Sequence, residues 1–246
     1  VTSRMMIASP EGHAGKSIVA LGLVDALSRR VGRVGVFRPV SRSTTERDAV
    51  LELLLAHDAV HLDYEDAIGT TYEAVHDDAE AALATIVARF HLLEDRFDAI
   101  VIVGSDYTDV GSPTELGFNA RVAANLGASV LLVLGGRDPE TDAPRSADQL
   151  RQLADVTTAE LAQAHASIAG IVVNRAEPSA IDAIPGAVAD AVPDGVPIWS
   201  IPEDALLSAP SVGALFAATD ASLLRGDADR LARESLGTVV AGSIGA

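Results

Sequence analysis

Short apolar runs rich in Val, Ile and Leu alternate along the chain with longer stretches whose apolar residues recur at helical spacing. Such apolar runs are typical of parallel strands that are buried on both faces of a sheet. We expect strands over residues 4–9, 33–38, 99–103, 129–134, 168–173, 197–201 and 236–241. We expect helices over residues 15–30, 44–57, 77–97, 115–126, 145–166, 181–192 and 211–233.

The alternation of strand and helix predicts an α/β fold with three layers, in which a mainly parallel sheet carries helices on both faces. Pro39 is expected to close the second strand, and Thr44 or Thr45 to act as the N-cap of the following helix. The chain has 246 residues and no internal repeat, low-complexity tract or clear linker. We therefore expect one domain over residues 1–246, cut from a longer protein because the sequence stops just after an apolar run.

The composition of the chain excludes several classes of binding partner and of site. The net charge is -17, with 35 acidic and 18 basic side chains, so nucleic acid and anionic membranes are not expected to bind. The chain has no cysteine, which excludes disulfides, thiolate nucleophiles and zinc–thiolate sites. No apolar run approaches the roughly 20 residues that span a bilayer, and no room is left for a signal peptide. We predict a cytoplasmic location.

The segment 9–17, Ser-Pro-Glu-Gly-His-Ala-Gly-Lys-Ser, joins the first expected strand to the first expected helix. It follows the phosphate-loop pattern G-x-x-x-x-G-K-[ST], except that Pro10 stands at the first glycine position. A bare Gly-Lys-Ser is often only a helix start, but this position at the carboxyl end of a parallel strand favours phosphate binding. The residues expected at the phosphates are Gly12, His13, Ala14, Gly15, Lys16 and Ser17. Lys16 would neutralise the β- and γ-phosphates, and the Ser17 hydroxyl would ligate Mg²⁺.

Several blocks of sequence extend this pattern over most of the chain. They are residues 9–17, 37–40, 47–50, 171–175 and 201–204. With these blocks in this order, the chain resembles the dethiobiotin synthetase-like and cobyrinic acid a,c-diamide synthase-like branch of P-loop proteins. Within that branch it is most similar to the N-terminal domain of long bacterial phosphate acetyltransferases, through residues 47–57, 119–127 and 201–212.

The resemblance implies a nucleotide-binding, regulatory domain of a phosphate acetyltransferase in acetyl-CoA and acetate metabolism, without the catalytic transferase part. Its partners would be a nucleotide and the remaining domains of the same protein, and self-association into a homo-oligomer is left open. The implied cofactors are ATP, or another nucleotide, and Mg²⁺. No catalytic residue is assigned.

The resemblance also implies roles for individual residues. Asp48 lies where the synthetases place a Mg²⁺-binding aspartate. Asn174, followed by Arg175, matches the Asn-Arg pair that reads the adenine base, and Pro202-Glu203 matches a segment near the base and ribose. From the residues alone, Asp48 could instead be a first-turn helix residue, and Asn174 could close a strand.

Two departures from the synthetase pattern affect the expected chemistry. The synthetases carry Lys-Pro-Val after the second strand to hold a substrate carboxylate or carbamate, whereas this chain has Arg38. Where they place a Mg²⁺-binding Glu after the next strand, this chain reads Val-Gly-Ser-Asp-Tyr over 103–107. Asp106 could supply that carboxylate, or could be an ordinary turn residue. We therefore expect an anion contact at Arg38 and candidate metal ligands at Ser17, Asp48 and Asp106.

Two alternatives compete with a regulatory domain. One is a stand-alone Mg-ATP-dependent ligase of the dethiobiotin synthetase or cobyrinic acid a,c-diamide synthase type, against which Arg38 and the missing Glu argue. The other is a dimeric partitioning-type ATPase, whose signature lysine would fall where Glu11 stands.

Overall fold

The computed structural model describes residues 2–43, 46–105 and 115–237. The chain divides into two compact units, Val1–Pro202 and Glu203–Ala246, and each is described by itself. The expectation of one domain over residues 1–246 stays a prediction.

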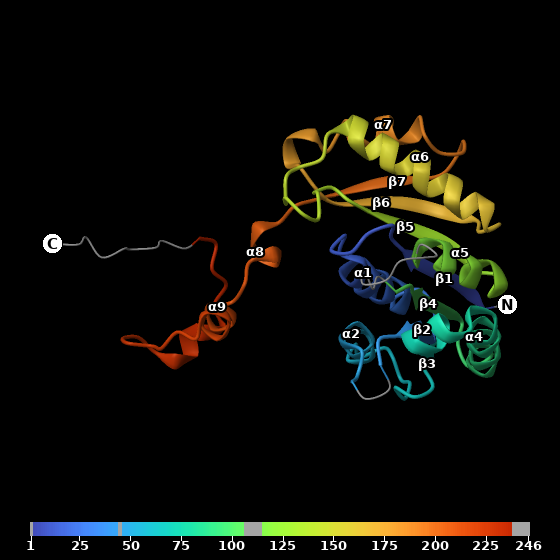
Figure 1. Cartoon of the computed structure of the whole chain (residues 1–246), viewed down its shortest axis with the longest axis horizontal. Coiled ribbons are helices and arrows are strands. Elements are labelled where there is room, and N and C mark those ends of the chain that lie inside the picture. The colour runs from blue at the N-terminus through green and yellow to red at the C-terminus, as the bar shows by residue number, and fades with distance from the viewer. Residues whose placement is uncertain (1, 44–45, 106–114, 238–246) are drawn as a thin grey trace. The chain divides into compact units, whose positions relative to one another are not determined.

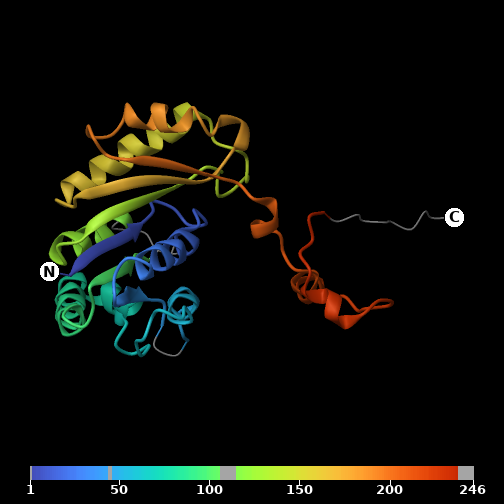
Figure 2. The same ribbon diagram turned by 180° about the vertical axis from the view of Figure 1, so that it is seen from behind.

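A seven-stranded sheet forms the centre of the first unit, in the order β3-β2-β4-β1-β5-β6-β7, and every pair of neighbours is parallel (Figure 1). The strands are β1 Ser3–Ala8, β2 Val34–Ser41, β3 Ile68–Thr71, β4 Ala99–Val103, β5 Ser129–Gly135, β6 Ile168–Ala176 and β7 Ile198–Pro202. The first strand in sequence, β1, lies between β4 and β5, in the middle of the sheet (Figure 2). The segment that follows β1 is therefore held at the centre of the carboxyl edge.

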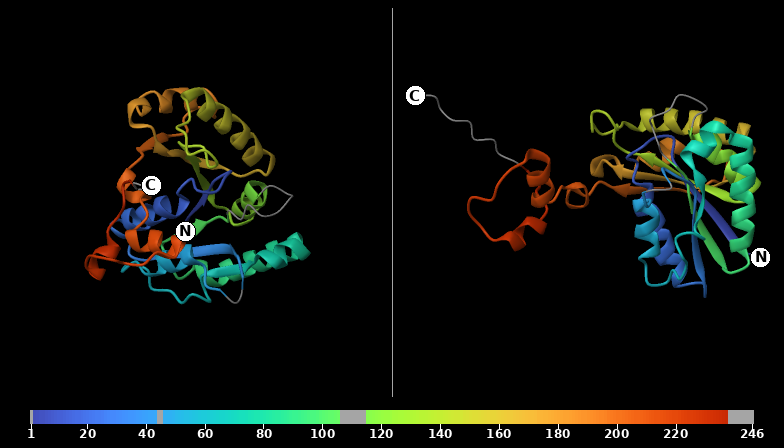
Figure 3. Two further views of the ribbon diagram at one scale, coloured as in Figure 1. Left: turned by 60° about the vertical axis from the view of Figure 1, so that its left-hand side comes forward. Right: turned by 60° about the horizontal axis from the view of Figure 1, so that its bottom comes forward.

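Helices cover both faces of this sheet (Figure 3), which confirms the predicted three-layer α/β fold. They are α1 Lys16–Ser28, α2 Ala49–Leu55, α3 Tyr72–Asp77, α4 Ala79–Glu94, α5 Glu115–Asn125, α6 Ala147–Gln163 and α7 Ile184–Ala189, with a short 3₁₀ turn at Pro178–Ala180. Because successive strand residues point to opposite faces, β1 supplies Met6 and Ala8 to one core and Ile7 to the other. The first core contains α4 to α7, and the second contains α1 and α2.

The β2 strand runs through Pro39 instead of ending before it. Its ladder with β4 ends at Phe37, while Arg38 and Val40 pair with β3 on the other side. The nitrogen of Pro39 therefore faces the side on which the ladder has already ended, and the missing N–H costs no strand hydrogen bond. The expected end of the strand was wrong for this reason, and β3 itself was not predicted.

Two expected helices begin elsewhere than predicted. The helix over 44–57 begins at Ala49, and its N-cap is Asp48, because the Asp48 carboxylate accepts a hydrogen bond from Leu51 N–H. Thr44 and Thr45, the predicted caps, lie outside the described residues. The stretch 77–97 is interrupted at Asp78, whose side chain accepts from the N–H groups of Glu80 and Ala81 and starts α4.

The second unit contains less regular structure than the sequence suggests. The helix expected over 211–233 is α9 Val212–Thr219 followed by a 3₁₀ turn at Ala228–Ala232, and a short helix α8 Ala205–Ser208 precedes them. Asp220, with φ of 51°, ends α9. Of the strand expected over 236–241, residues 236 and 237 are not in a strand and the rest lie outside the described residues. None of the helices described in either unit is long and apolar enough to cross a bilayer.

Candidate functional site

The loop between β1 and α1 is a tight turn that ends at Gly15. Ser9 Oγ accepts a hydrogen bond from Glu11 N–H (3.3 Å) and donates to the Glu11 carbonyl (2.9 Å), which folds the first half of the loop. Gly15 is the N-cap of α1 and has φ of 81°, a left-handed conformation that side chains with a Cβ rarely adopt. A Cβ at Gly15 would also lie 2.2 Å from Asn174 Nδ2. Backbone and packing together therefore require glycine here.

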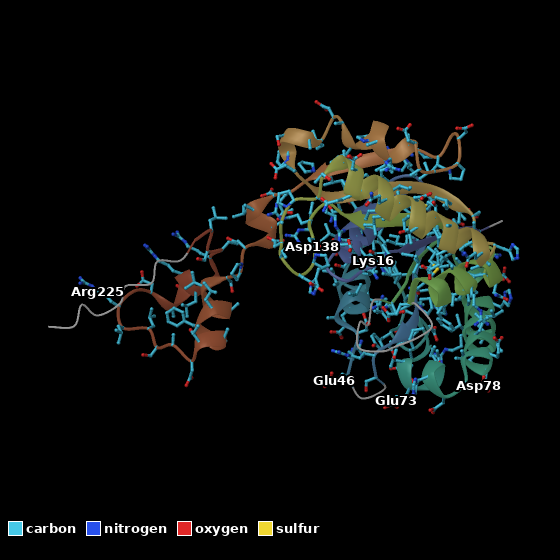
Figure 4. All side chains as sticks on the ribbon, turned by 45° about the horizontal axis from the view of Figure 1, so that its top comes forward. Lys16, Glu46, Glu73, Asp78, Asp138 and Arg225 are labelled. Carbon is cyan, nitrogen blue, oxygen red and sulfur yellow. The ribbon has the colours of Figure 1, made fainter. Side chains whose placement is uncertain are left out.

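Lys16 is the only lysine of the chain and lies at the centre of the first unit (Figure 4). It is buried, and its ammonium donates a hydrogen bond to the Ser105 carbonyl at 3.0 Å, just after β4. Asn119 on α5 fixes that carbonyl: its Nδ2 donates to Ser105 O (3.0 Å), and its Oδ1 accepts from Ser105 N–H (3.2 Å). The lysine therefore bridges the loop after β1 and the end of the neighbouring strand β4.

The Arg38 side chain on β2 also contacts the end of β4. Its Nη1 donates to the carbonyls of Val103 (3.1 Å) and Gly104 (2.5 Å), and its Nε donates to Asp48 Oδ2 (3.1 Å). Both side chains of this ion pair are almost fully buried, with exposed fractions of 3% for Arg38 and 6% for Asp48. The backbone N–H of Asp48 donates to the Tyr64 hydroxyl at 2.7 Å. Asp48 is thus held by Arg38, by Tyr64 and by the Leu51 N–H group.

A cavity of about 230 Å³ lies between the phosphate loop and the ends of β2 and β4. Its lining residues are His13, Gly15, Lys16, Ser17, Arg38, Val50 and Val103. The structure therefore brings together the predicted phosphate-binding residues and the predicted anion contact. The lining includes two basic side chains, those of Lys16 and Arg38, and, among the described residues, no carboxylate, so the cavity suits an anion.

The predicted metal ligands are not brought together in the same way. Ser17 lines the cavity, but Asp48 does not, and its two carboxylate oxygens accept from Arg38 and from Leu51 N–H. Asp106 lies outside the described residues. In the described part of the chain no group of three or more His, Asp or Glu residues could hold a metal ion. The Mg²⁺ roles of Ser17, Asp48 and Asp106 stay predictions.

The predicted base-binding residues lie at the ends of β6 and β7. Asn174 is buried, and its Nδ2 donates to the carbonyl of Ala14 (2.9 Å), so it reaches the phosphate loop itself. Arg175 has φ of 59° and pairs with Asp142 at 2.9 Å in the loop after β5. Pro202 is the last residue of β7 and of the first unit, and Glu203 begins the second unit. Their roles toward a base stay predictions.

A second ion pair at the loop, partly buried, was not predicted. Arg145, just before α6, donates from Nη2 to Glu11 Oε2 at 2.7 Å, and its Nη1 contacts the other oxygen of the same carboxylate. Gly135 N–H also donates to Glu11 Oε1 (3.3 Å). The hydrogen bond to Glu11 raises the pKa of Arg145 above its ordinary value. Glu11 and Arg145 are 134 positions apart, so no local pattern in the sequence could join them.

The loop after β5 holds further charges beside this pair. Asp138 accepts hydrogen bonds from the backbone N–H and the hydroxyl of Thr141, both at 2.9 Å, and these bonds lower the pKa of Asp138. Arg145 lies 3.8 Å from the same carboxylate. The carboxyl edge of the sheet therefore has a cationic cavity on one side of the phosphate loop and a mixed ionic network on the other.

Comparison with known proteins places this geometry in a family. Residues 3–211 match the AAA_26 family, described as an AAA domain. The chain is 30% identical over 183 residues to a phosphate acetyltransferase of Nitratidesulfovibrio vulgaris, which covers 72% of this chain and 25% of that protein. It is 27% identical over 234 residues to a phosphate acetyltransferase of Synechocystis, which covers 92% of this chain and 33% of that protein. The chain thus spans only a quarter to a third of the length of these relatives, and the predicted resemblance to phosphate acetyltransferases is confirmed.

Solved structures support the fold. The ATP complex of McdA from Cyanothece superposes with a TM-score of 0.52 at 16% identity, covering 84% of this chain and 85% of that chain. Chloroplast FtsY from Physcomitrella patens gives a TM-score of 0.52 at 18% identity, covering 80% of this chain and 57% of that chain. The central β1, the loop that ends at Gly15 and the buried Lys16, together with the family match over most of the sequence, show that this chain belongs to the AAA_26 family of P-loop AAA domains.

Proposed function

We propose that this chain is the nucleotide-binding, regulatory domain of a phosphate acetyltransferase. The observation that carries the proposal is the cavity at the phosphate loop, which is lined by Lys16, Ser17 and Arg38 at the centre of the carboxyl edge. Parallel α/β sheets bind their ligands at this edge. The chain matches only 25% and 33% of the length of its relatives named phosphate acetyltransferases, which supports a domain that serves the rest of such a protein.

ATP is the nucleotide we propose. Its phosphates would lie against Lys16 and the N–H groups at the start of α1, where the helix dipole favours negative charge. Asn174, which contacts the loop at Ala14, is the nearest predicted base-binding residue. Mg²⁺ would supply charge neutralisation to the phosphates when bound, and Ser17 is the described cavity residue with an oxygen to offer it.

Regulation requires only that the ligand bind two states of the parent protein with different affinity. A domain of this kind needs no catalytic group of its own. Acetyl transfer would then take place elsewhere in the longer protein, in acetyl-CoA and acetate metabolism, and nucleotide at this site would change its rate.

Calorimetric titration of the purified chain with ATP and with GTP tests the nucleotide site. We expect Lys16→Met, which keeps most of the buried stem and removes the ammonium, to weaken ATP binding by about tenfold or more. Arg29→Met, which removes one positive charge at the exposed end of α1, is the matched control and should leave affinity unchanged. Absence of binding by the wild-type chain, or equal binding by the two variants, would refute the nucleotide site.

The single lysine allows an independent measurement. An amine-reactive reagent can modify only Lys16 and the α-amine of the chain, so mass spectrometry can follow one ε-amine without interference. We expect ATP to slow labelling of Lys16 while labelling of the α-amine continues at the same rate. For the regulatory role, acetyl transfer by the full-length gene product should depend on ATP concentration, and this dependence should be lost in Lys16→Met.

A further inference from the structure

The arrangement of charges around the phosphate-loop cavity differs from that of a site built for a metal–nucleotide complex. The cavity wall presents Lys16 and Arg38, whereas Asp48 lies behind Arg38 and does not line the cavity. A divalent cation entering with a ligand would therefore meet two cations and the Ser17 hydroxyl first. The Asp48 carboxylate is already paired with the Arg38 guanidinium.

Asp48 is also committed to the fold. Its Oδ1 accepts from Leu51 N–H (2.9 Å) as the N-cap of α2, its Oδ2 accepts from Arg38, and its backbone N–H donates to Tyr64. A metal ion on this carboxylate would compete with Arg38 for its negative charge. The buried guanidinium would then lose its counter-charge beside a second positive ion, an arrangement that low-dielectric surroundings penalise strongly.

Arg38, by contrast, is fixed in the place where positive charge is needed. Its Nε is held by Asp48 and its Nη1 by the carbonyls of Val103 and Gly104, so the plane of the guanidinium is set before any ligand arrives. A guanidinium stays protonated at every physiological pH and matches the geometry of phosphate oxygens. It can therefore neutralise phosphate charge without a metal.

We propose that Arg38 takes the part that a divalent cation has in other phosphate-loop sites, so that this pocket selects the metal-free polyphosphate anion of a nucleotide. The proposal rests on the nucleotide site proposed above, and it assigns to Arg38 the charge neutralisation that Mg²⁺ would otherwise supply there. The Arg38–Asp48 pair excludes the metal from the carboxylate, and Lys16 and Arg38 share the charge of the phosphates.

Calorimetry in EDTA and in excess MgCl₂, at constant ionic strength, tests whether the pocket selects the metal-free anion. The two probes are ATP and inorganic tripolyphosphate, which lacks the base. We expect the wild-type chain to bind both probes in EDTA at least as tightly as in MgCl₂. Asp48→Asn keeps an N-cap acceptor for Leu51 and removes the carboxylate charge. It should bind in EDTA as tightly as the wild type or more tightly.

Removing Arg38 should have the opposite effect. Arg38→Gln should lower affinity for tripolyphosphate in EDTA by about tenfold or more. Because this variant leaves Asp48 buried and unpaired, the double variant Arg38→Gln/Asp48→Asn serves as the folded comparison, with its unfolding midpoint measured beside that of the wild type. It should show the same loss of affinity.

The outcomes separate the two proposals. Binding that needs MgCl₂, or gains tenfold or more from it, and that Asp48→Asn abolishes would overturn the role of Arg38 and leave the nucleotide site standing. No binding in either buffer would overturn the nucleotide site, and the inference with it. Unchanged affinity in the double variant would show that Arg38 does not neutralise the phosphates.

Discussion

Single residues of the phosphate loop are constrained by backbone conformation as much as by chemistry. Gly15 combines a left-handed backbone with a contact to Asn174 that leaves no room for a Cβ, and Lys16 follows it directly into the buried centre of the unit. Because Asn174 also bonds to the carbonyl of Ala14, the loop and the end of β6 support each other. The loop is therefore shaped before a ligand binds.

Gly15→Ala should destabilise the fold by about 1–3 kcal/mol, because alanine would be strained at φ of 81° and its Cβ would displace Asn174. Gly22→Ala is the matched control on the same helix. Gly22 lies inside α1 with nothing within 4 Å of an added Cβ, so alanine should stabilise the helix by about 0.5–1 kcal/mol. Urea denaturation of the two variants measures both free energies of unfolding, and equal effects would contradict this account of the loop.

At the scale of elements, ion pairs between loops hold the carboxyl edge together. The pair of Glu11 and Arg145 ties the loop after β1 to the segment before α6, and Arg145 Nη1 also donates to the Gly135 carbonyl (3.0 Å) at the end of β5. Glu11 places a carboxylate in the proposed phosphate loop. Its pairing with Arg145 compensates the negative charge, which would otherwise repel phosphate. The pair thus both positions and neutralises the loop.

Arg145→Gln alone should therefore lower the free energy of unfolding and the affinity for ATP more than the double variant Arg145→Gln/Glu11→Gln does. The single variant leaves a half-buried carboxylate without its guanidinium, which should lower the free energy of unfolding by about 1–3 kcal/mol and weaken ATP binding by about tenfold. The double variant removes that carboxylate charge and should recover part of both losses. Arg29→Gln, in an exposed pair with Asp25 on α1, should change stability by less than about 1 kcal/mol. Denaturation and calorimetry on the wild type, Arg145→Gln, Glu11→Gln and the double variant measure the coupling, and additive effects would refute it.

The elements that the sequence predicted well are those with strong local signals. The apolar run 99–103 coincides with β4, and the position of Lys16 after the first strand located the cavity. One element set by a distant partner was missed, because β3 is a four-residue strand that contains a glycine and pairs with β2 at the edge of the sheet. The start of α4 at Ala79 was missed as well, although the Asp78 side chain that caps it is a local signal. The pairs Arg38–Asp48 and Glu11–Arg145 join segments that only the fold brings together. Sequence spacing therefore could not predict which charges at the site are paired.

At the scale of the whole molecule, the two units differ in how they are stabilised. Both hydrophobic cores consist of residues of the first unit. In the second unit, none of the residues for which burial is described is buried, and α9 exposes its alanines although it is almost entirely apolar. Burial of apolar area is the main source of folding stability, so the first unit should carry nearly all of it.

A chain that ends at Pro202 should therefore unfold in one transition with a midpoint within a few degrees of that of the whole chain. It retains Lys16, Arg38 and Asn174, so it should also bind tripolyphosphate with unchanged affinity. ATP provides the sharper comparison, because Glu203 is predicted to lie near the base and ribose and is absent from the shortened chain. Loss of ATP affinity without loss of tripolyphosphate affinity would assign that role to the residues after Pro202, and Glu203→Gln in the whole chain would then reproduce it. Equal loss for both ligands, or a lowered midpoint, would instead show that the first unit depends on the second for its fold.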